Sequence, residues 1–223
     1  MIQHYQLSPG DIDVIYNGVD INLFTPQNRI AYRDTVRAKY AIAPDDVLLL
    51  FVGSGFKRKG LRHAINALSL INTSQKMKLL VVGKGNIGEY QRFAREKGVF
   101  DKLVFAGVCK HIHEIYAGGD IFLFPSEYDA FGTACLEAMA SGLPVVVSKA
   151  SGASEIITHG EDGFIVNHPI DAHEIAKQLQ ALLEKGTREQ MGAVARQKAE
   201  GCSFQANIEK TLQVYRKVVD SHS

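Results

Sequence analysis

Unbroken apolar runs alternate along this sequence with amphipathic segments of helical period, and this alternation limits the possible folds more than any other feature. The two longest runs span residues 47–53 and 77–83. Four shorter runs follow at residues 102–106, 120–124, 143–147 and 163–166. Runs that are apolar on both faces are typical of parallel strands covered by helices on both sides. We therefore predict an α/β fold with a doubly wound parallel sheet of about six strands.

Helical segments fall between these strands and again at the end of the chain. Leu61, Ile65 and Leu68 share one helical face after the first strand. Beyond Asp171 the sequence shows only helical patterns, which predicts a helical C-terminal tail.

We divide the chain into three parts by these patterns. Residues 1–44 are expected to contain a linker, residues 45–203 to form the α/β domain, and residues 204–223 to form a C-terminal helix. Within the first part, residues 13–16 could form a strand, and residues 17–20 are typical of a turn into a linker.

Composition excludes several classes of protein. Lys and Arg total 25 against 24 Asp and Glu, so the net charge of +1 provides no electrostatic case for a nucleic-acid partner. No window approaches the roughly 20 apolar residues of a membrane span, and the first residues lack the pattern of a signal peptide. The three cysteines are odd in number and far apart, which favours reduced thiols in a cytoplasmic protein. The composition does not exclude peripheral contact with a membrane.

We expect no metal site. His111 and His113 lie two residues apart, and in a helix such side chains diverge, so surface or capping roles are the better interpretation.

Glycines and cations follow the first predicted strand. Ser54, Gly55, Arg58 and Lys59 lie in a turn just before a helix start, where free backbone amides attract phosphate. The turn lacks the Gly-Lys-Ser/Thr ending of a Walker A loop. A solvated turn with surface lysines is the alternative.

A second glycine-rich turn follows the next strand. Gly83, Gly85 and Gly88 match G-x-G-x-x-G, the dinucleotide fingerprint. That fingerprint also needs an acid after the following strand, where this chain has Val108 and its neighbours instead. We therefore predict a turn that lines a pocket, and the missing acid argues against a dehydrogenase.

Two acids follow the fourth strand. Asp129 precedes a helix expected to open near Gly132 or Thr133, and Glu137 lies about one turn inside it. A helix cap and a surface carboxylate are the alternatives for these acids, although Glu137 sits in an apolar stretch where an unpartnered carboxylate is rare. Carboxylates bind sugar hydroxyls, while amides and lysines bind phosphates. The combination predicts a sugar-phosphate site.

These residues resemble the signature of the retaining glycosyltransferases of family 4, which has two acids separated by seven residues. Asp129 and Glu137 keep the spacing, although the first acid of the family is usually glutamate. The similar segments are residues 17–20, 51–60, 125–132, 136–145, 151–157 and 162–164. The Phe-Val-Gly-Ser and Arg-Lys-Gly segments are similar to the lipopolysaccharide-core glucosyltransferases.

The resemblance implies the Rossmann-like, donor-binding half of a GT-B fold. It also implies that residues 1–44 are the linker and the end of a missing N-terminal domain. The other half, which usually binds the acceptor, would be absent, so the chain alone should transfer sugar poorly or not at all. The last helix crosses back to that half in relatives, which implies an exposed apolar face here that could drive self-association.

The resemblance also implies an activity: metal-independent transfer of a hexose from a nucleotide diphosphate sugar, with UDP-glucose as the best guess, to a glycan or glycolipid acceptor in cell-envelope or lipopolysaccharide synthesis. Asp129 and Lys59 would be catalytic. The implied substrate-binding residues are Ser54, Gly55, Arg58, Lys59, Gly83, Val108, Asp129, Ala130, Phe131, Gly132, Thr133 and Glu137. The full enzyme would be cytoplasmic or peripheral to the inner face of the membrane.

A non-catalytic module that binds sugar nucleotides or acts as a scaffold is the main alternative. An epimerase or phosphorylase would share the architecture, but the sequence shows no lysine-bound pyridoxal site for a phosphorylase.

Overall fold

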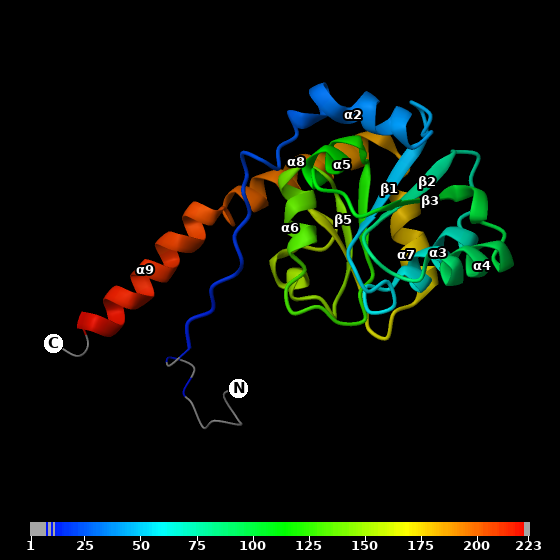
Figure 1. Cartoon of the computed structure of the whole chain (residues 1–223). Helices are drawn as coiled ribbons and strands as arrows, with labels where there is room; N and C mark the ends of the chain where they lie inside the picture. The colour runs from blue at the N-terminus through cyan, green and yellow to red at the C-terminus, as the bar shows by residue number, and fades with distance from the viewer. Residues whose placement is uncertain (1–7, 9, 11, 221–223) are drawn as a thin grey trace.

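The computed structural model describes residues 8, 10 and 12–220. Their six strands form one parallel sheet in the order β3-β2-β1-β4-β5-β6 (Figure 1). The strands are β1 (Val47–Val52), β2 (Met77–Val82), β3 (Leu103–Gly107), β4 (Ile121–Phe124), β5 (Val145–Ser148) and β6 (Gly163–Val166). The predicted six-stranded, doubly wound sheet is confirmed.

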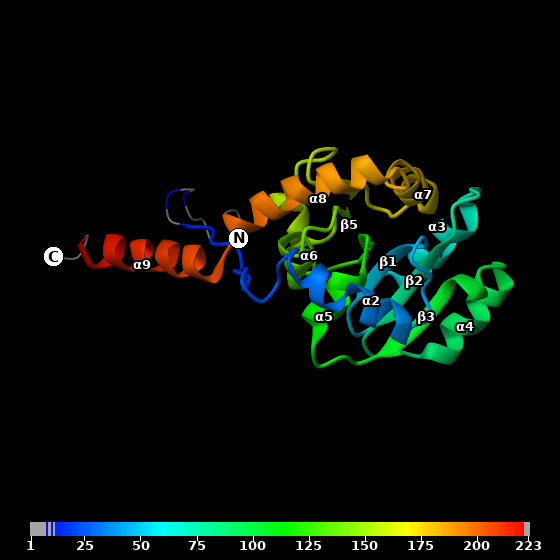
Figure 2. The same ribbon diagram turned by 90° about the horizontal axis from the view of Figure 1, so that it is seen from above.

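Helices cover both faces of this sheet (Figures 1 and 2). One face carries α3 (Leu61–Leu70), α4 (Ile87–Glu96) and α7 (Ala172–Ala181). The other carries α2 (Asn28–Lys39), α5 (Ile112–Gly118), α6 (Thr133–Ala140) and α8 (Lys185–Glu200). Two 3-10 helices, η2 (Phe100–Lys102) and η3 (Gly152–Ile156), and the terminal α9 (Phe204–Asp220) complete the fold.

Strand β1 shows why the apolar runs are unbroken. Val47, Leu49 and Phe51 pack into the cluster under α3, while Leu48 and Leu50 pack into the opposite cluster. Because successive side chains point to opposite faces, a strand buried on both sides needs an apolar residue at every position.

The strand order reverses between β1 and β4, which pair directly. The loops that leave the carboxyl ends of these two strands are therefore neighbours at the switch point, where open α/β sheets bind ligands. These are the loops that carry Lys59 and Asp129.

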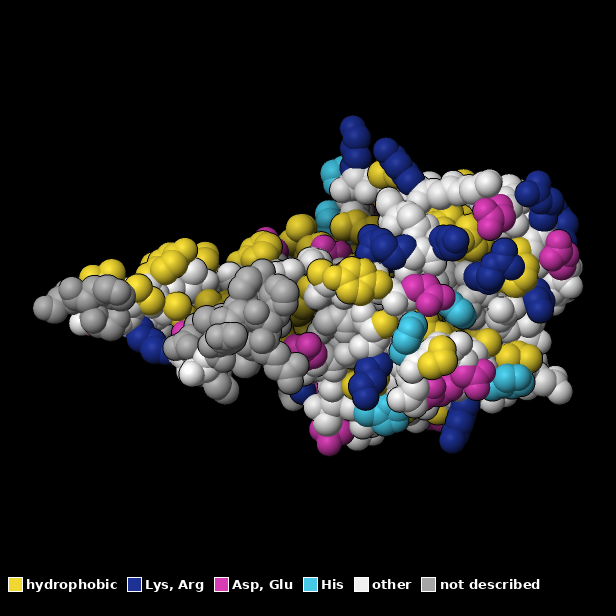
Figure 3. Space-filling view, turned by 90° about the horizontal axis from the view of Figure 1, so that it is seen from below, with side chains coloured by type: hydrophobic (Ala, Val, Ile, Leu, Met, Phe, Trp, Pro, Cys, Tyr) yellow, Lys and Arg dark blue, Asp and Glu magenta, His cyan; other side chains and the backbone are white. Residues whose placement is uncertain are grey.

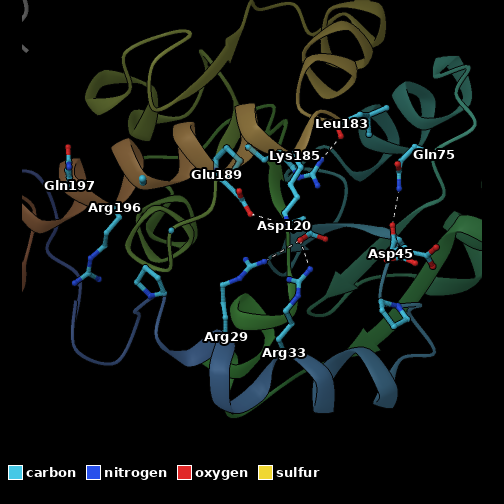
Figure 4. A pocket seen from close by; sticks show the side chains of 17 residues that line it. Arg29, Arg33, Asp45, Gln75, Asp120, Leu183, Lys185, Glu189, Arg196 and Gln197 are labelled. Atoms are coloured by element: carbon cyan, nitrogen blue, oxygen red, sulfur yellow. Dashed lines mark hydrogen bonds and ion pairs between the residues drawn. The ribbon is translucent and has the colours of Figure 1, made fainter.

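Helix α2 lies within the segment that was expected to be a linker. Its arginines reach the amino ends of β1 and β4, opposite the switch-point loops. Arg33 donates to the carboxylate of Asp120 over 2.7 Å, and Arg29 approaches it at 3.4 Å (Figure 4). Arg37 donates to the same carboxylate over 3.1 Å. The Leu48 amide donates to the same carboxylate over 2.8 Å. Burial alone would raise the pKa of Asp120, but Arg33, the Leu48 amide and Arg37 hold it below its usual value.

Helix α2 was not predicted from the sequence. Its buried residues are Val36 and Arg37, so it lacks the continuous apolar face that indicates a helix packed on a sheet. The suggested strand at residues 13–16 is wrong, since these residues pair with no strand.

A cavity of about 860 Å³ lies between α2 and α8, at the amino ends of the strands (Figure 4). Its cations already have partners: Arg188 and Arg196 donate to backbone carbonyls, and Lys185 faces Glu189 at 3.7 Å. The charges around this cavity therefore hold elements together, and the cavity lies far from the switch-point loops.

Helix α9 projects from the body of the domain (Figures 1 and 2). Its apolar side chains form an exposed stripe, which is visible in Figure 3 and includes Phe204, Ile208, Leu212 and Tyr215. The exposed apolar face expected of the last helix is present. Among the described residues, no helix combines the length and apolarity needed to cross a bilayer.

We predict that Asp120→Asn lowers the free energy of unfolding by about 3–5 kcal/mol, because it leaves the buried Arg37 without a compensating charge. Urea titration followed by circular dichroism measures this loss. Glu189→Gln removes an acid from an exposed ion pair, so it should cost less than about 1 kcal/mol. Equal losses of unfolding free energy for both variants would show that the Asp120 carboxylate does not hold α2 in place.

Candidate functional site

Lys59 and Asp129 meet at the switch point. Lys59 lies just before α3, and its ammonium contacts the carboxylate of Asp129 in the loop after β4. Gly60 allows this approach, since a Cβ there would lie 1.7 Å from the carbonyl oxygen of Pro125. The sequence showed a glycine after the cations, but only the fold shows that its missing side chain lets the loop after β4 pack against this turn.

Arg58 adds a second cation beside the same acid. Its guanidinium lies 3.2 Å from the Asp129 carboxylate, and the Phe131 amide donates to the other oxygen over 3.2 Å. Burial alone would raise the pKa of Asp129, but the hydrogen bond and charge of Lys59, the Phe131 amide and Arg58 lower it. Asp129 is therefore ionised at neutral pH, and two cations against one acid leave a surplus positive charge.

Helix α6 begins beside this cluster, at Thr133 as the sequence predicted. Gly132 adopts a φ of 86°, and a Cβ there would lie 2.7 Å from the Ser151 hydroxyl oxygen. No described residue accepts a hydrogen bond from the Gly132 or Thr133 amide. These free amides add to the positive potential of the helix start.

The two glycine-rich turns pack against each other. A Cβ on Gly83 would lie 2.2 Å from the Gly53 carbonyl oxygen, and the Ser54 hydroxyl accepts from the Lys84 amide over 3.2 Å. Close packing of the turns thus accounts for Gly83. Gly55 and Val108 are exposed at the same edge of the sheet. Figure 3 looks onto this edge, where Lys, Arg, Asp, Glu and His side chains gather.

Glu137 lies within α6 and accepts a hydrogen bond from the Tyr116 hydroxyl over 2.9 Å. Burial raises the pKa of Glu137, and the Tyr116 hydrogen bond offsets this only in part. Glu137 is half-buried and has a partner, which argues against a plain surface carboxylate. The sequence had no signal for Tyr116, which lies on another helix 21 residues earlier.

The structure thus brings Arg58, Lys59 and Asp129 into contact, with residues 130–133 directly beside them. The Glu137 carboxylate instead accepts its hydrogen bond from Tyr116.

Two contacts of the nearby loops were not predicted. His63 contacts the carboxylate of Glu127, which lies two residues before Asp129 in the loop after β4. Tyr16, from the segment expected to be linker, donates from its hydroxyl to Glu155 over 3.0 Å.

For the two histidines after β3, the expected surface position is confirmed for the exposed His111, while the expected divergence is wrong. Their rings lie 6.0 Å apart, so they do not diverge, because His111 precedes α5 and only His113 lies within it. His111 occupies the N-cap position without a side-chain hydrogen bond. No group of three or more His, Cys, Asp and Glu side chains in the described part of the chain is placed to hold a metal ion.

We predict that Glu137→Gln stabilises the protein at pH 7. Because folding raises the pKa of this carboxyl above its ordinary value of 4.5, ionisation costs the wild type stability as the pH rises through the folded pKa. Below the ordinary value both states are protonated and the advantage of the variant should vanish. Thermal unfolding from pH 3 to 8 measures the difference, with exposed Glu161→Gln as the control. If Glu137→Gln were more stable than the wild type by the same amount at every pH, ionisation of Glu137 would not be the cause.

Comparisons of sequence and fold with known proteins identify the family of this chain. The sequence matches the family described as "Glycosyl transferases group 1" over residues 32–198. An uncharacterized glycosyltransferase of Methanocaldococcus jannaschii is 33% identical over 92% of this chain and 54% of its own length. The D-inositol 3-phosphate glycosyltransferase of Paenarthrobacter aurescens is 28% identical over 98% of this chain and 55% of its own. The chain spans about half the length of these curated relatives.

Solved structures agree with this match. WaaG, a glycosyltransferase involved in lipopolysaccharide biosynthesis, aligns with a TM-score of 0.81 and 26% identity over 92% of this chain and 58% of its own. Anabaena HepE, solved with UDP-glucose, aligns with a TM-score of 0.78 and 25% identity over 93% of this chain and 57% of its own. The family match covers all six strands of the described sheet and both switch-point loops. This chain therefore belongs to the group 1 family of glycosyl transferases.

Proposed function

We propose that this chain is the donor-binding half of a retaining, family 4 glycosyltransferase, and that it binds a nucleotide diphosphate sugar. The contact of Lys59 and Arg58 with Asp129, beside the free amides of Gly132 and Thr133, carries the proposal. A diphosphate binds to fixed positive charges, and the hydroxyls of a sugar donate hydrogen bonds to an ionised carboxylate. The site has both at one place.

The chemistry follows from where charge develops. When a sugar leaves its diphosphate, negative charge grows on the bridging oxygen, and preorganised cations and amides stabilise it. Lys59 would approach the diphosphate first, because Nζ has three donor positions and Asp129 is its one ion-pair partner among the described residues. Arg58 and the start of α6 would add to this field, so we propose that transfer needs no metal ion.

The remaining roles follow the positions of the side chains. Asp129 would hold hydroxyls of the donor sugar, Glu137 the ribose diol and Val108 the base. Ser54, Gly55, Gly83, Ala130 and Phe131 would line the same site. Because Glu137 is half-buried against Tyr116, its role requires the ribose to reach this inner face of α6.

Two relatives suggest the substrates. HepE was solved with UDP-glucose, so UDP-glucose is our first candidate donor. WaaG acts in lipopolysaccharide biosynthesis, so we propose a glycan or glycolipid acceptor of the cell envelope. Acceptor binding would need the other half of a GT-B enzyme, in the cytoplasm or at the inner face of its membrane.

A non-catalytic module that binds sugar nucleotides is the second candidate. It would use the same contact of Lys59 and Arg58 with Asp129, and it would bind the nucleotide without transferring the sugar. Sugar transfer by the chain supplied with an N-terminal half would exclude this candidate, and binding without transfer would support it.

We predict that the chain binds UDP and that Lys59→Ala weakens this binding about tenfold or more, because a hydrogen bond to a charged group contributes about 1.5–3 kcal/mol. Uridine, which lacks phosphate, should be affected far less. Calorimetry with UDP and NMR titration with uridine measure the two affinities, and GDP and ADP test the base. EDTA should leave the affinity for UDP unchanged.

Two controls make this test specific. Lys57→Ala removes an exposed cation from the same turn and should change UDP affinity little. The double variant Lys59→Ala with Asp129→Asn removes both charges of the pair. It therefore separates the loss of a Lys59 contact with the phosphates from repulsion between the phosphates and an Asp129 carboxylate that no longer has Lys59 beside it. Full recovery in the double variant, or equal losses for UDP and uridine, would refute the phosphate role of Lys59.

A further inference from the structure

Tyr16 joins the N-terminal segment to the donor-site loops. Its ring stacks on that of Phe131 with centroids 6.1 Å apart and planes at 29°. Its hydroxyl donates to the carboxylate of Glu155 in η3, over 3.0 Å. One side chain therefore spans the loop after β4 and the 3-10 helix after β5.

Phe131 is a direct part of the site. Its amide donates to the Asp129 carboxylate over 3.2 Å, and its carbonyl accepts from the Ser151 hydroxyl over 3.1 Å. It is also the residue before Gly132, whose amide is free. A shift of the Phe131 ring would therefore move both the acid and the helix start.

The backbone around Tyr16 is tied to α9. The Tyr16 carbonyl accepts from the Asn207 side chain over 2.7 Å. Val19 pairs with both sides of Ser203, donating to the Cys202 carbonyl and accepting from the Phe204 amide, each over 3.0 Å. Gly18 allows this contact, because a Cβ there would lie 2.8 Å from Phe204 Cα. Residues 16–19 and the start of α9 thus form one connected unit.

We propose that Tyr16 is a positioning residue of the donor site, which sets the geometry of residues 129–133 and links it to the unit formed by residues 16–19 and α9. The functional part of this inference rests on the proposed nucleotide binding. Any partner that reorients α9 would act on the Asp129 loop through Tyr16, and a bound diphosphate would act on α9 by the same contacts in reverse.

Three variants of the whole chain test the contacts separately. Tyr16→Ala removes both the ring stack and the hydrogen bond. Tyr16→Phe keeps the stack and loses only the hydrogen bond to Glu155. Tyr215→Ala is the matched control, because it removes an exposed tyrosine ring from α9 far along the chain from these contacts.

Amide hydrogen exchange reports on the loop without any ligand. The amides of Asp129, Phe131, Gly152 and Ala153 donate hydrogen bonds within the two loops. In Tyr16→Ala they should exchange several-fold faster, while the amides of the six strands keep their wild-type rates. Tyr16→Phe should recover most of the protection, because the ring stack remains.

UDP affinity reports on the function. Tyr16→Ala should weaken UDP binding by about two- to tenfold, the range expected from the loss of an aromatic contact. Uridine affinity should change little, since the loop holds phosphate and sugar rather than base. A merely structural role would not separate UDP from uridine.

Each outcome decides the inference. Unchanged loop exchange in Tyr16→Ala, faster exchange throughout the sheet, or the same effect in Tyr215→Ala would overturn it. A wild-type chain that binds none of UDP, GDP and ADP would refute the proposed function, and the exchange rates would still decide whether Tyr16 positions the loop.

Discussion

Burial of a parallel sheet on both faces is the constraint on which the rest of this structure depends. Strand positions covered by helices must be mostly apolar, so charged side chains gather mainly at the two ends of the strands. All amino ends lie at one edge and all carboxyl ends at the other. The chain therefore has two polar edges, and the same physical requirement generates a structural cluster at one and a candidate binding site at the other.

The two clusters differ in how far their charges are satisfied. At the amino edge, the carboxylate of Asp120 is buried and saturated by arginines and an amide, which suits a clamp for α2. At the carboxyl edge, the Asp129 carboxylate meets Lys59 and Arg58 beside amides without partners. Unused donors and surplus positive charge are what an anionic ligand requires. Tyr16 connects this edge to α9, whose apolar face is exposed.

Much of the fold and part of the site could be predicted. Strand bounds agreed within two residues, because continuous apolar runs have one physical explanation, and the start of α6 was predicted from its glycine. Helix α2 could not be predicted, because arginines that bury against a distant acid look like surface residues in the sequence. The role of Tyr16 was hidden for a similar reason: its partners Phe131 and Glu155 are more than a hundred residues away.

The sequence by itself determined the layered α/β fold and the candidate residues at the strand ends, since periodicity and composition are local properties of the chain. The tertiary structure alone decided which of those residues meet. Lys59 and Asp129 lie 70 residues apart, and they touch because β1 and β4 are adjacent and Gly60 lets the two loops approach. Strand order and close backbone contact depend on the whole chain at once, so no local pattern encodes them.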